Sequence, residues 1–337
     1  MQYTNERLEH LRHRWRTTRG KHLLRTIKKS RCYLNPVDFR EKARNFSGIN
    51  DTEIDGGIDL RGADLSGFDF RVPVKENDDG FSENIAILSS IHFEGAILKH
   101  CDFQEGKIHD CHFEQADLSH SGFKNASINN CSFEYADCTG IDLHGTKLVA
   151  CIFIDAVIKD VGLSATIVDE KTLFGKELKS EKEGSMHAAA IEYKQIKELY
   201  KNSNLHGLAD FYHYREMVAK RKLIKKTHPS RVVNFVFGDL LCKYGTSFVR
   251  VFMSAFVLVM SFAGLYRYTD SLMFQNKDVP VSYFDAIYFS LSTFTTLGYG
   301  DYHAIGNMRF IAGFESFVGA VLISLFTVIV ARNVIRD

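Results

Sequence analysis

The sequence of 337 residues predicts a multidomain membrane protein, in which a β-solenoid precedes a helical linker and an all-α region with two membrane spans. Three observations lead to this prediction. Bulky apolar residues recur at every fifth position through the first half of the chain, a period that neither helix nor strand has. Two long apolar runs lie near the C-terminus. A segment with the pattern Thr-x-Gly-Tyr-Gly lies between these runs.

The period of five runs without a miss from Leu88 to Leu163, and a mostly small residue stands two positions before each bulky one. A square solenoid with one five-residue segment on each side has this period. Residues 20 apart then stack in successive coils, at the strand spacing of about 4.8 Å. The stacking predicts two interior ladders, of Phe93, Phe113, Phe133 and Phe153 and of Cys111, Cys131 and Cys151.

Three earlier units, centred on Leu60, Leu65 and Phe70, have the same pattern but are out of phase with the rest. The acidic stretch Glu76–Gly80 between the two sets is expected to protrude as a loop. Five of the seven cysteines fall on interior positions, so we expect them to be small buried side chains rather than metal ligands or disulfides. The compartment is then expected to be reducing.

Ala63-Asp64-Leu65 and Ala116-Asp117-Leu118 resemble the Ala-(Asp/Asn)-Leu-x-x units of the pentapeptide-repeat family. The resemblance implies a right-handed quadrilateral β-solenoid, which we place at residues 51–168. A basic arm, residues 1–50, precedes it; residues 1–45 carry 13 Lys or Arg and 4 Asp or Glu, whereas residues 57–168 carry 18 acidic and 8 basic ones. Such an arm could bind anionic lipid or nucleic acid. We expect a solvated helix or contact with an acidic solenoid of the same or a neighbouring subunit, and no nucleic-acid partner.

The two apolar runs have the length of membrane-spanning helices. Val251–Tyr266 has 16 residues without a charge, and Phe310–Ala331 has 22 with one charge, Glu315. Spanning takes about 20 apolar residues, so polar flanking residues extend the shorter run. Between the runs, Ser282–Thr295 predicts a short helix that Ser282 can cap.

The segment that follows this short helix has the composition of an ion-coordinating loop. A dehydrated potassium ion needs a cage of oxygens, which backbone carbonyls supply when successive C=O groups face one axis. An ordinary strand alternates these groups. Gly298 and Gly300 are spaced to re-aim alternate carbonyls, because glycine tolerates positive φ. The Thr296 hydroxyl would add oxygens, and the Tyr299 ring would point outward and brace the wall.

With its flanking spans and short helix, Thr296-Leu297-Gly298-Tyr299-Gly300-Asp301 resembles the selectivity filter of tetrameric two-transmembrane potassium channels. The resemblance covers roughly residues 247–332 and implies a potassium-selective homotetramer whose Ser282–Thr295 segment is the pore helix. The expected filter residues are Thr296, Leu297, Gly298, Tyr299 and Gly300, of which the first four coordinate K⁺. The expected supporting residues are Thr295, Asp301 and Glu315.

Two residues of the second span have alternative interpretations. Glu315 is a functional candidate because it is acidic inside a span; it either ties this helix to the back of the filter or lies hydrated at the outer rim. Gly319 lies 19 residues after Gly300, close to where related channels carry a gating hinge, but close helix packing explains a glycine equally well. His303, beyond the filter, is a candidate for pH-sensitive conductance.

Residues 169–245 are expected to form the helical linker, and residues 246–337 the two-span pore domain. Helical periodicity predicts a hairpin of Ser185–Asn204 and Leu208–Lys226. Val232–Leu241 mixes apolar and polar residues and is expected to lie in the membrane interface and couple cytoplasmic movement to the first span.

Lys and Arg residues gather before the first span and after the second, so both termini are expected in the cytoplasm. We expect a multi-pass protein of the bacterial inner membrane. Its expected partners are lipid, further copies of itself, potassium ions and an unidentified ligand of the solenoid. No nucleotide-binding glycine loop or catalytic-triad spacing occurs, so neither a cofactor nor enzymatic activity is expected.

Two alternatives stay open. A weakly selective cation channel would keep the pore, although the tyrosine of Gly-Tyr-Gly argues against it, because related non-selective pores depart from the motif there. A membrane-anchored pentapeptide-repeat interaction protein would use the acidic solenoid as its working part and the spans as anchors.

Overall fold

The computed structural model describes residues 3–30, 57–73, 84–275 and 281–336. They belong to two compact units, Met1–Leu223 and Ile224–Asp337. The expected loop Glu76–Gly80 lies outside the described residues.

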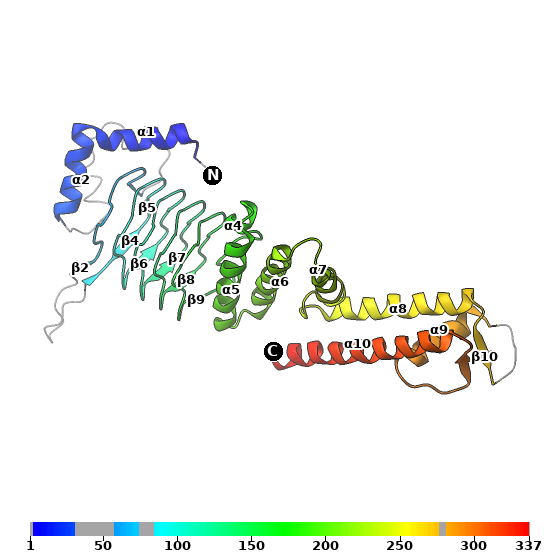
Figure 1. Ribbon diagram of the computed structural model, residues 1–337. Coiled ribbons are helices and arrows are strands. Elements are labelled where there is room, and N and C mark those ends of the chain that lie inside the picture. The colour runs from blue at the N-terminus through cyan, green and yellow to red at the C-terminus, as the bar shows by residue number, and fades with distance from the viewer. Residues whose placement is uncertain (1–2, 31–56, 74–83, 276–280, 337) are drawn as a thin grey trace. The chain divides into compact units, whose positions relative to one another are not determined.

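The first unit is built on a solenoid whose coils stack side by side (Figure 1). One side of it is a parallel sheet in the order β4-β6-β7-β8-β9. Lys107 pairs with Ser127 and Ser127 with Lys147, so each coil takes 20 residues, as the period predicts. The strands of this sheet are β4 (Ile87–Ser89), β6 (Lys107–His109), β7 (Ser127–Asn129), β8 (Lys147–Val149) and β9 (Ile167–Val168).

The three earlier units continue the same stack. Asp64 bridges Ile97 and Asp69 bridges Asp102, both in parallel, so the coil that contains these units lies in register on the next. Their phase differs only because extra residues lie between the two coils. The strands of this region are β1 (Ile58–Asp59), which pairs with β5 (Ile91–His92), and β2 (Val72–Pro73), which pairs with β3 (Asn84–Ile85).

The interior of the solenoid is a set of stacked side chains. Both predicted ladders are confirmed: Phe93, Phe113, Phe133 and Phe153 stack with ring centroids 5.0, 4.9 and 4.6 Å apart, and the three cysteines are buried. A second phenylalanine ladder runs beside the first. Its rings are Phe70, Phe103 and Phe123, with centroids 4.4 Å apart at each step.

Corners between sides of the coil are turned by residues in the left-handed region, for example Gly95 at φ +66° and Gln115 at φ +56°. Most of these residues are not glycine, which costs about 1–3 kcal/mol at each such position. The stacked interior and the coil-to-coil hydrogen bonds hold the chain in this conformation.

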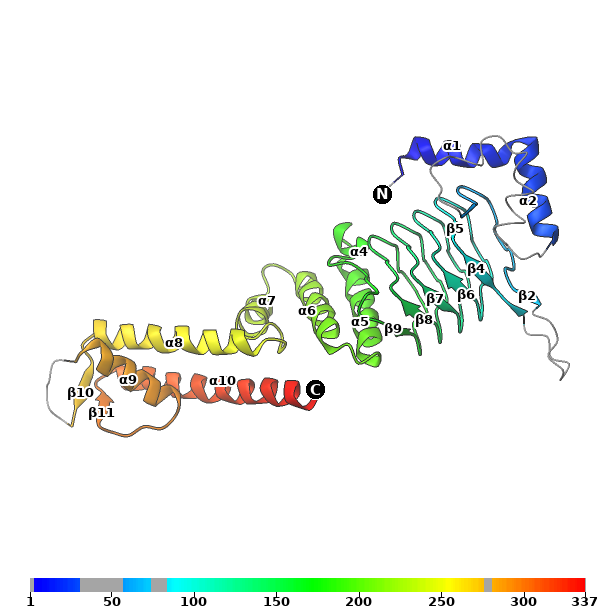
Figure 2. The same cartoon turned by 180° about the vertical axis from the view of Figure 1, so that it is seen from behind.

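Helices α1 (Asn5–Arg16) and α2 (Thr18–Ser30) of the basic arm lie against the solenoid (Figure 2). The Arg14 guanidinium donates to both carboxylate oxygens of Asp59 at 2.6 and 2.5 Å, and Trp15 Nε1 donates to the Arg61 carbonyl at 2.7 Å. Burial raises the pKa of Asp59, but the hydrogen bonds from Arg14 and Arg61 outweigh it, so the pKa lies below its usual range. Of the expectations for the arm, contact with its own solenoid is therefore the one found.

Helices α4 (Lys179–Lys182), α5 (Met186–Asn202) and α6 (His206–Leu223) cover the last coil. The predicted hairpin of two long helices is present, and it shares the core of the solenoid. The Tyr200 hydroxyl donates to the Thr172 carbonyl at 2.6 Å, and the Tyr212 hydroxyl donates to the Gly175 carbonyl at 2.8 Å. These bonds tie each long helix to the chain that leaves the solenoid.

In the second unit, two long helices lie side by side with a short helix against both (Figures 1 and 2). Helices α8 (Phe248–Tyr268) and α10 (Met308–Arg336) are long and apolar enough to cross a membrane, and only 17% and 22% of their most apolar stretches are buried. Such exposure differs from a core helix of a soluble protein, which is mostly buried. The elements are α7 (Pro229–Val233), π-helix η1 (Asn234–Leu240), α8 (Phe248–Tyr268), β10 (Leu272–Phe274), α9 (Tyr283–Phe294), β11 (Tyr302–Ala304) and α10 (Met308–Arg336).

Candidate functional site

The short helix α9 is fixed at its start by a capping box. Ser282 Oγ accepts a hydrogen bond from the Asp285 N–H at 3.2 Å, and the Asp285 carboxylate accepts one from the Ser282 N–H at 2.9 Å. At the other end Thr295 is the C-cap, and its hydroxyl donates to the Leu291 carbonyl at 2.7 Å. Both ends of the predicted pore helix therefore lie within one residue of the prediction.

The chain after α9 alternates its backbone conformation. The φ angles of Thr296, Gly298 and Gly300 are +59°, +53° and +79°, whereas Leu297 and Tyr299 between them are not in the left-handed region. A strand would turn successive carbonyls to opposite sides, and a left-handed residue at every second position reverses that alternation. This is the backbone that a carbonyl-lined ion path requires. Thr296 holds it without being a glycine, which the glycine spacing alone did not predict.

These residues, Thr296–Gly300, which we call the filter segment after their predicted role, are exposed in the single chain. Two amides anchor its start: Leu297 N–H and Gly298 N–H donate to the Ser292 carbonyl at 3.0 and 3.3 Å. The Tyr299 ring stacks on Tyr288 of α9, with centroids 6.3 Å apart and planes 9° from parallel. The ring therefore lies against helix α9.

A small antiparallel sheet, which was not predicted from the sequence, pairs β10, before α9 in the chain, with β11, which comes after the filter segment. Asp301 joins the two, because its carboxylate accepts a hydrogen bond from the Tyr302 N–H and its carbonyl accepts one from the Gln275 N–H, both at 2.9 Å. His303 lies in β11 opposite Met273. Strands of three residues are too short for an alternating pattern to be visible.

Glu315 of α10 is completely buried. Its carboxylate accepts a hydrogen bond from the Tyr266 hydroxyl of α8 at 2.7 Å and lies in hydrogen-bond contact with Ser290 of α9. The Ser290 hydroxyl also lies 2.9 Å from the Val259 carbonyl. Of the two alternatives for this residue, the structure has the buried tie and not the hydrated rim. Neither hydroxyl partner was predicted, because a hydroxyl in an apolar run has no sequence signal of its own.

Gly319 of α10 lies where the backbone of Phe294, the last residue of α9, comes closest. A Cβ at this position would meet the carbonyl oxygen of Phe294 at far less than contact distance, and its carbonyl carbon at 2.8 Å. Close packing between α10 and the end of the pore helix thus accounts for this glycine without a hinge.

Comparisons with known families match these two regions separately. Residues 246–336 match the family described as ion channel, and residues 96–134 and 111–149 match the family of pentapeptide repeats. The chain therefore carries a pentapeptide-repeat solenoid followed in sequence by an ion-channel domain of the two-transmembrane type. It is a membrane protein. Neither family is a family of enzymes.

Several solved structures are similar to the solenoid. They include HetL, a pentapeptide repeat protein involved in heterocyst differentiation regulation from the cyanobacterium Nostoc sp. strain PCC 7120, at 15% identity and a TM-score of 0.23. The similarity covers 34% of this chain and 54% of HetL, so the chain spans about half of that protein. A pentapeptide repeat protein from the Arabidopsis thaliana thylakoid lumen has 18% identity and a TM-score of 0.25, over 38% of this chain and 74% of that one. Among curated proteins no match was found.

Proposed function

We propose that this protein is a potassium-selective channel, in which the carbonyls of Thr296, Leu297, Gly298 and Tyr299 coordinate the ion in place of water. The observation that carries the proposal is the left-handed conformation at every second residue from Thr296 to Gly300. The Thr296 hydroxyl contributes oxygens at the inner end. Potassium is the permeant ion of this account, and conduction through the pore needs no cofactor.

Four copies of the filter segment are required, because one chain supplies only one wall of the oxygen cage. Two features of the single chain support such an assembly. The filter segment is exposed, with Leu297 and Tyr299 having 63% and 68% of their surface accessible. The spanning helices also leave large apolar side chains uncovered, including Phe256 at 55% and Phe317 at 68%. Neighbouring subunits and lipid would cover these surfaces.

The supporting residues act through the back of the pore helix. Glu315 joins α8, α9 and α10, and Thr295 and Asp301 fix the two ends of the filter segment. We propose that this frame keeps the carbonyls at the spacing that potassium needs. Gly319 belongs to the same frame, since it lets α10 approach the end of α9.

The solenoid serves, in this account, as a cytoplasmic regulatory or assembly domain. The orientation rests on the basic residues at the inner ends of both spans. Residues of α7 and η1 such as Val232, Phe237 and Leu240 are 57–61% exposed and suit an interfacial segment next to the first span. The bacterial inner membrane is the expected location.

Rubidium uptake into liposomes tests the conduction. The full chain is expected to take up Rb⁺, and Gly298→Asp is expected to abolish uptake while the tetramer persists in detergent, because a side chain and charge then replace the re-aimed glycine. Gly264→Ala is the matched control, since a Cβ at Gly264 meets no atom within 4 Å. Uptake that survives Gly298→Asp would overturn the proposal.

A truncated chain separates the role of the pore from that of the solenoid. The cut is best made after Leu223, where the first compact unit ends, rather than within the helices that share the solenoid core. Unchanged flux from residues 224–337 would exclude a gating role for the solenoid and leave it an assembly role.

A further inference from the structure

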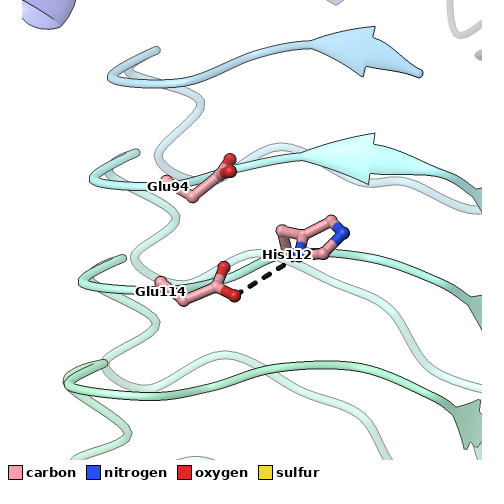
Figure 3. Close-up of side chains that lie close together, drawn as sticks. All are labelled: Glu94, His112 and Glu114. Carbon is pink, nitrogen blue, oxygen red and sulfur yellow. Dashed lines mark hydrogen bonds and ion pairs between the residues drawn. The ribbon is translucent and has the colours of Figure 1, made fainter. Parts of the chain in front are cut away.

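One side of the solenoid carries the pattern His-x-Glu in two successive coils. His92 and Glu94 belong to the first of these coils, and His112 and Glu114 belong to the next. Figure 3 shows Glu94, His112 and Glu114 on these two coils. The two imidazole rings stack with centroids 4.6 Å apart. The pattern stops there, because the next coil has Ser132 in the histidine position.

Three of these side chains bring possible metal ligands together. Glu94, His112 and Glu114 each offer one oxygen or nitrogen, and the three atoms lie within 4.8 Å of one another. His112 Nδ1 lies 3.3 Å from Glu114 Oε1. Two ligands of a tetrahedral ion at bond lengths of about 2.0–2.1 Å are separated by about the same distance. Small side-chain rotations would bring all three to one ion.

The two carboxylates have oxygens that no group in the described part of the chain satisfies. Glu94 is 6% exposed, and its Oε2 has no hydrogen-bond partner. Glu114 Oε2 is likewise buried without a hydrogen bond of normal geometry, although the Ser132 hydroxyl of the next coil lies near this carboxylate. A buried carboxylate oxygen without a donor costs about 1–3 kcal/mol or more. A bound cation would satisfy both oxygens at once.

We propose that Glu94, His112 and Glu114 form a binding site for one divalent transition-metal ion, of which zinc is the representative, with water in the fourth position. The two carboxylates balance the charge of the ion. A mixed set of one nitrogen and two oxygens suits zinc-like ions, whereas calcium and magnesium prefer oxygen ligands alone. His92 Nδ1 lies 3.0 Å from Glu94 Oε1, which leaves Oε2 for the ion and orients the carboxylate.

Two histidine–glutamate ion pairs are the simpler account of the same residues. The hydrogen bond to Glu114 raises the pKa of His112, as an ion pair would. However, ion pairing occupies only one oxygen of each carboxylate and leaves both Oε2 atoms without a hydrogen bond of normal geometry. In the metal site His92 holds Glu94 Oε1, and the ion binds Glu94 Oε2 and the Glu114 carboxylate in place of the hydrogen bond from His112.

The buried cysteines are not competing ligands. Metal binding needs the thiolate. Burial raises the pKa of Cys101 and Cys151 to about 12, and among the described residues the group of three possible ligands close enough to share an ion contains no cysteine.

The proposed site lies next to the residues of the solenoid that contact the N-terminal arm. The neighbouring corner residues hold helix α1: Gln115 exchanges hydrogen bonds with the backbone of Tyr3, and a Cβ at Gly95 would collide with the Leu8 side chain. An ion that fixes Glu94 and Glu114 therefore fixes the surface on which the arm lies. The proposal is independent of ion conduction.

Zinc binding to the full-length protein in detergent tests the proposal, by equilibrium dialysis with metal analysis. We expect one Zn²⁺ per chain, and binding at least about tenfold weaker in Glu94→Gln, His112→Gln and Glu114→Gln. Glu134→Gln is the matched control, because Glu134 follows Ser132 one coil further on and lacks a histidine partner; it should bind as the parent does. Absence of zinc binding, or equal loss in all four variants, would overturn the site.

Two further readouts keep the test decisive if one variant folds poorly. Co²⁺ should give the visible bands of nitrogen and oxygen ligation without a thiolate charge-transfer band, and a thiolate band would assign the ion to cysteine instead. Zn²⁺ should also slow tryptic cleavage within α1 in the parent and in Glu134→Gln, but not in Glu114→Gln. Equal protection in Glu114→Gln would contradict the proposal.

Discussion

The carboxylate of Glu315 accepts a hydrogen bond from the hydroxyl of Tyr266 at 2.7 Å, although the two residues lie 49 positions apart in the chain. Ser290 contacts the same carboxylate from the pore helix. One buried side chain thus connects both spanning helices to the helix that supports the filter segment. Loss of this connection should disturb the conformation of the filter segment, even though none of the three residues faces the proposed ion path.

We therefore expect Glu315→Ala to destabilise the proposed tetramer and impair conduction, because the Tyr266 hydroxyl loses its buried acceptor at about 1–3 kcal/mol, whereas the Ser290 hydroxyl keeps the Val259 carbonyl. Glu315→Gln should retain most of the stability, since its amide can still accept from Tyr266 and donate to Ser290. Thermal dissociation of the tetramer in detergent measures the effect. Ser324→Ala, which removes only a hydroxyl bonded to its own helix, is the control. Equal melting of Glu315→Ala and Ser324→Ala would show that the tie is dispensable.

Gly319→Ala separates close packing from a hinge. If packing requires the glycine, the added methyl group meets the Phe294 backbone and lowers the thermal stability. Gly264→Ala in α8 has open space and should be neutral or up to about 1 kcal/mol more stable. The two variants are compared by their melting temperatures. A Gly319→Ala protein of normal stability with altered channel opening would favour the hinge.

The phenylalanine ladder predicts that shortening one of its side chains to alanine strongly destabilises the solenoid. Phe133 is fully buried and stacks on Phe113 and Phe153. Phe133→Ala should destabilise the solenoid by about 3–5 kcal/mol, because a cavity remains in the stack. The maleimide labelling rate of the buried Cys131, followed by mass spectrometry, measures local opening and should rise. Ile167→Ala, at a side chain that is 56% exposed, should leave the rate nearly unchanged; a similar rise there would argue against the ladder as the stabilising element.

Protonation of Glu216 at low pH should lower the stability of the α5–α6 hairpin. Burial alone would raise the pKa of this carboxyl, but hydrogen bonds from His213, Lys220 and Lys197 outweigh it and lower the pKa from 4.5 to about 2. The folded state thus favours the charged form, so the contribution is complete above pH 4.5 and is lost as the pH falls toward 2. Hydrogen exchange of the hairpin should accelerate in that window. Glu216→Gln should remove the dependence on pH, whereas Glu198→Gln, at a half-buried residue of the same hairpin, should keep it. Acceleration of exchange in the same pH window in Glu216→Gln would assign the effect to another group.

The solenoid could be predicted almost completely, because a period of five in apolar residues is also the repeat of the structure. The 20-residue register and the ladder of Phe93 and Phe113 follow from it directly. What the period could not show was that Phe70 continues the stack in register despite the extra residues after it. An interruption of the period does not reveal whether the units on its two sides stack in register.

In the candidate pore, the features that depend on single residues and their neighbours in sequence could be predicted. Gly298 and Gly300 indicate the left-handed positions, and Ser282 indicates the start of the pore helix. The partners of Glu315 were not predictable, because they depend on how three helices pack. The same holds for Glu94 and Glu114, which have no distinguishing signal in the sequence. The stacking of successive coils brings them together near the arm.

The reversal potential with potassium on one side of a liposome membrane and sodium on the other tests the central claim most directly. The account predicts a potential close to the potassium equilibrium value, together with its loss in Gly298→Asp, since peptide oxygens held by alternating left-handed residues favour the ion whose hydration they replace. A potential near zero, with sodium carried as readily as potassium, would contradict it.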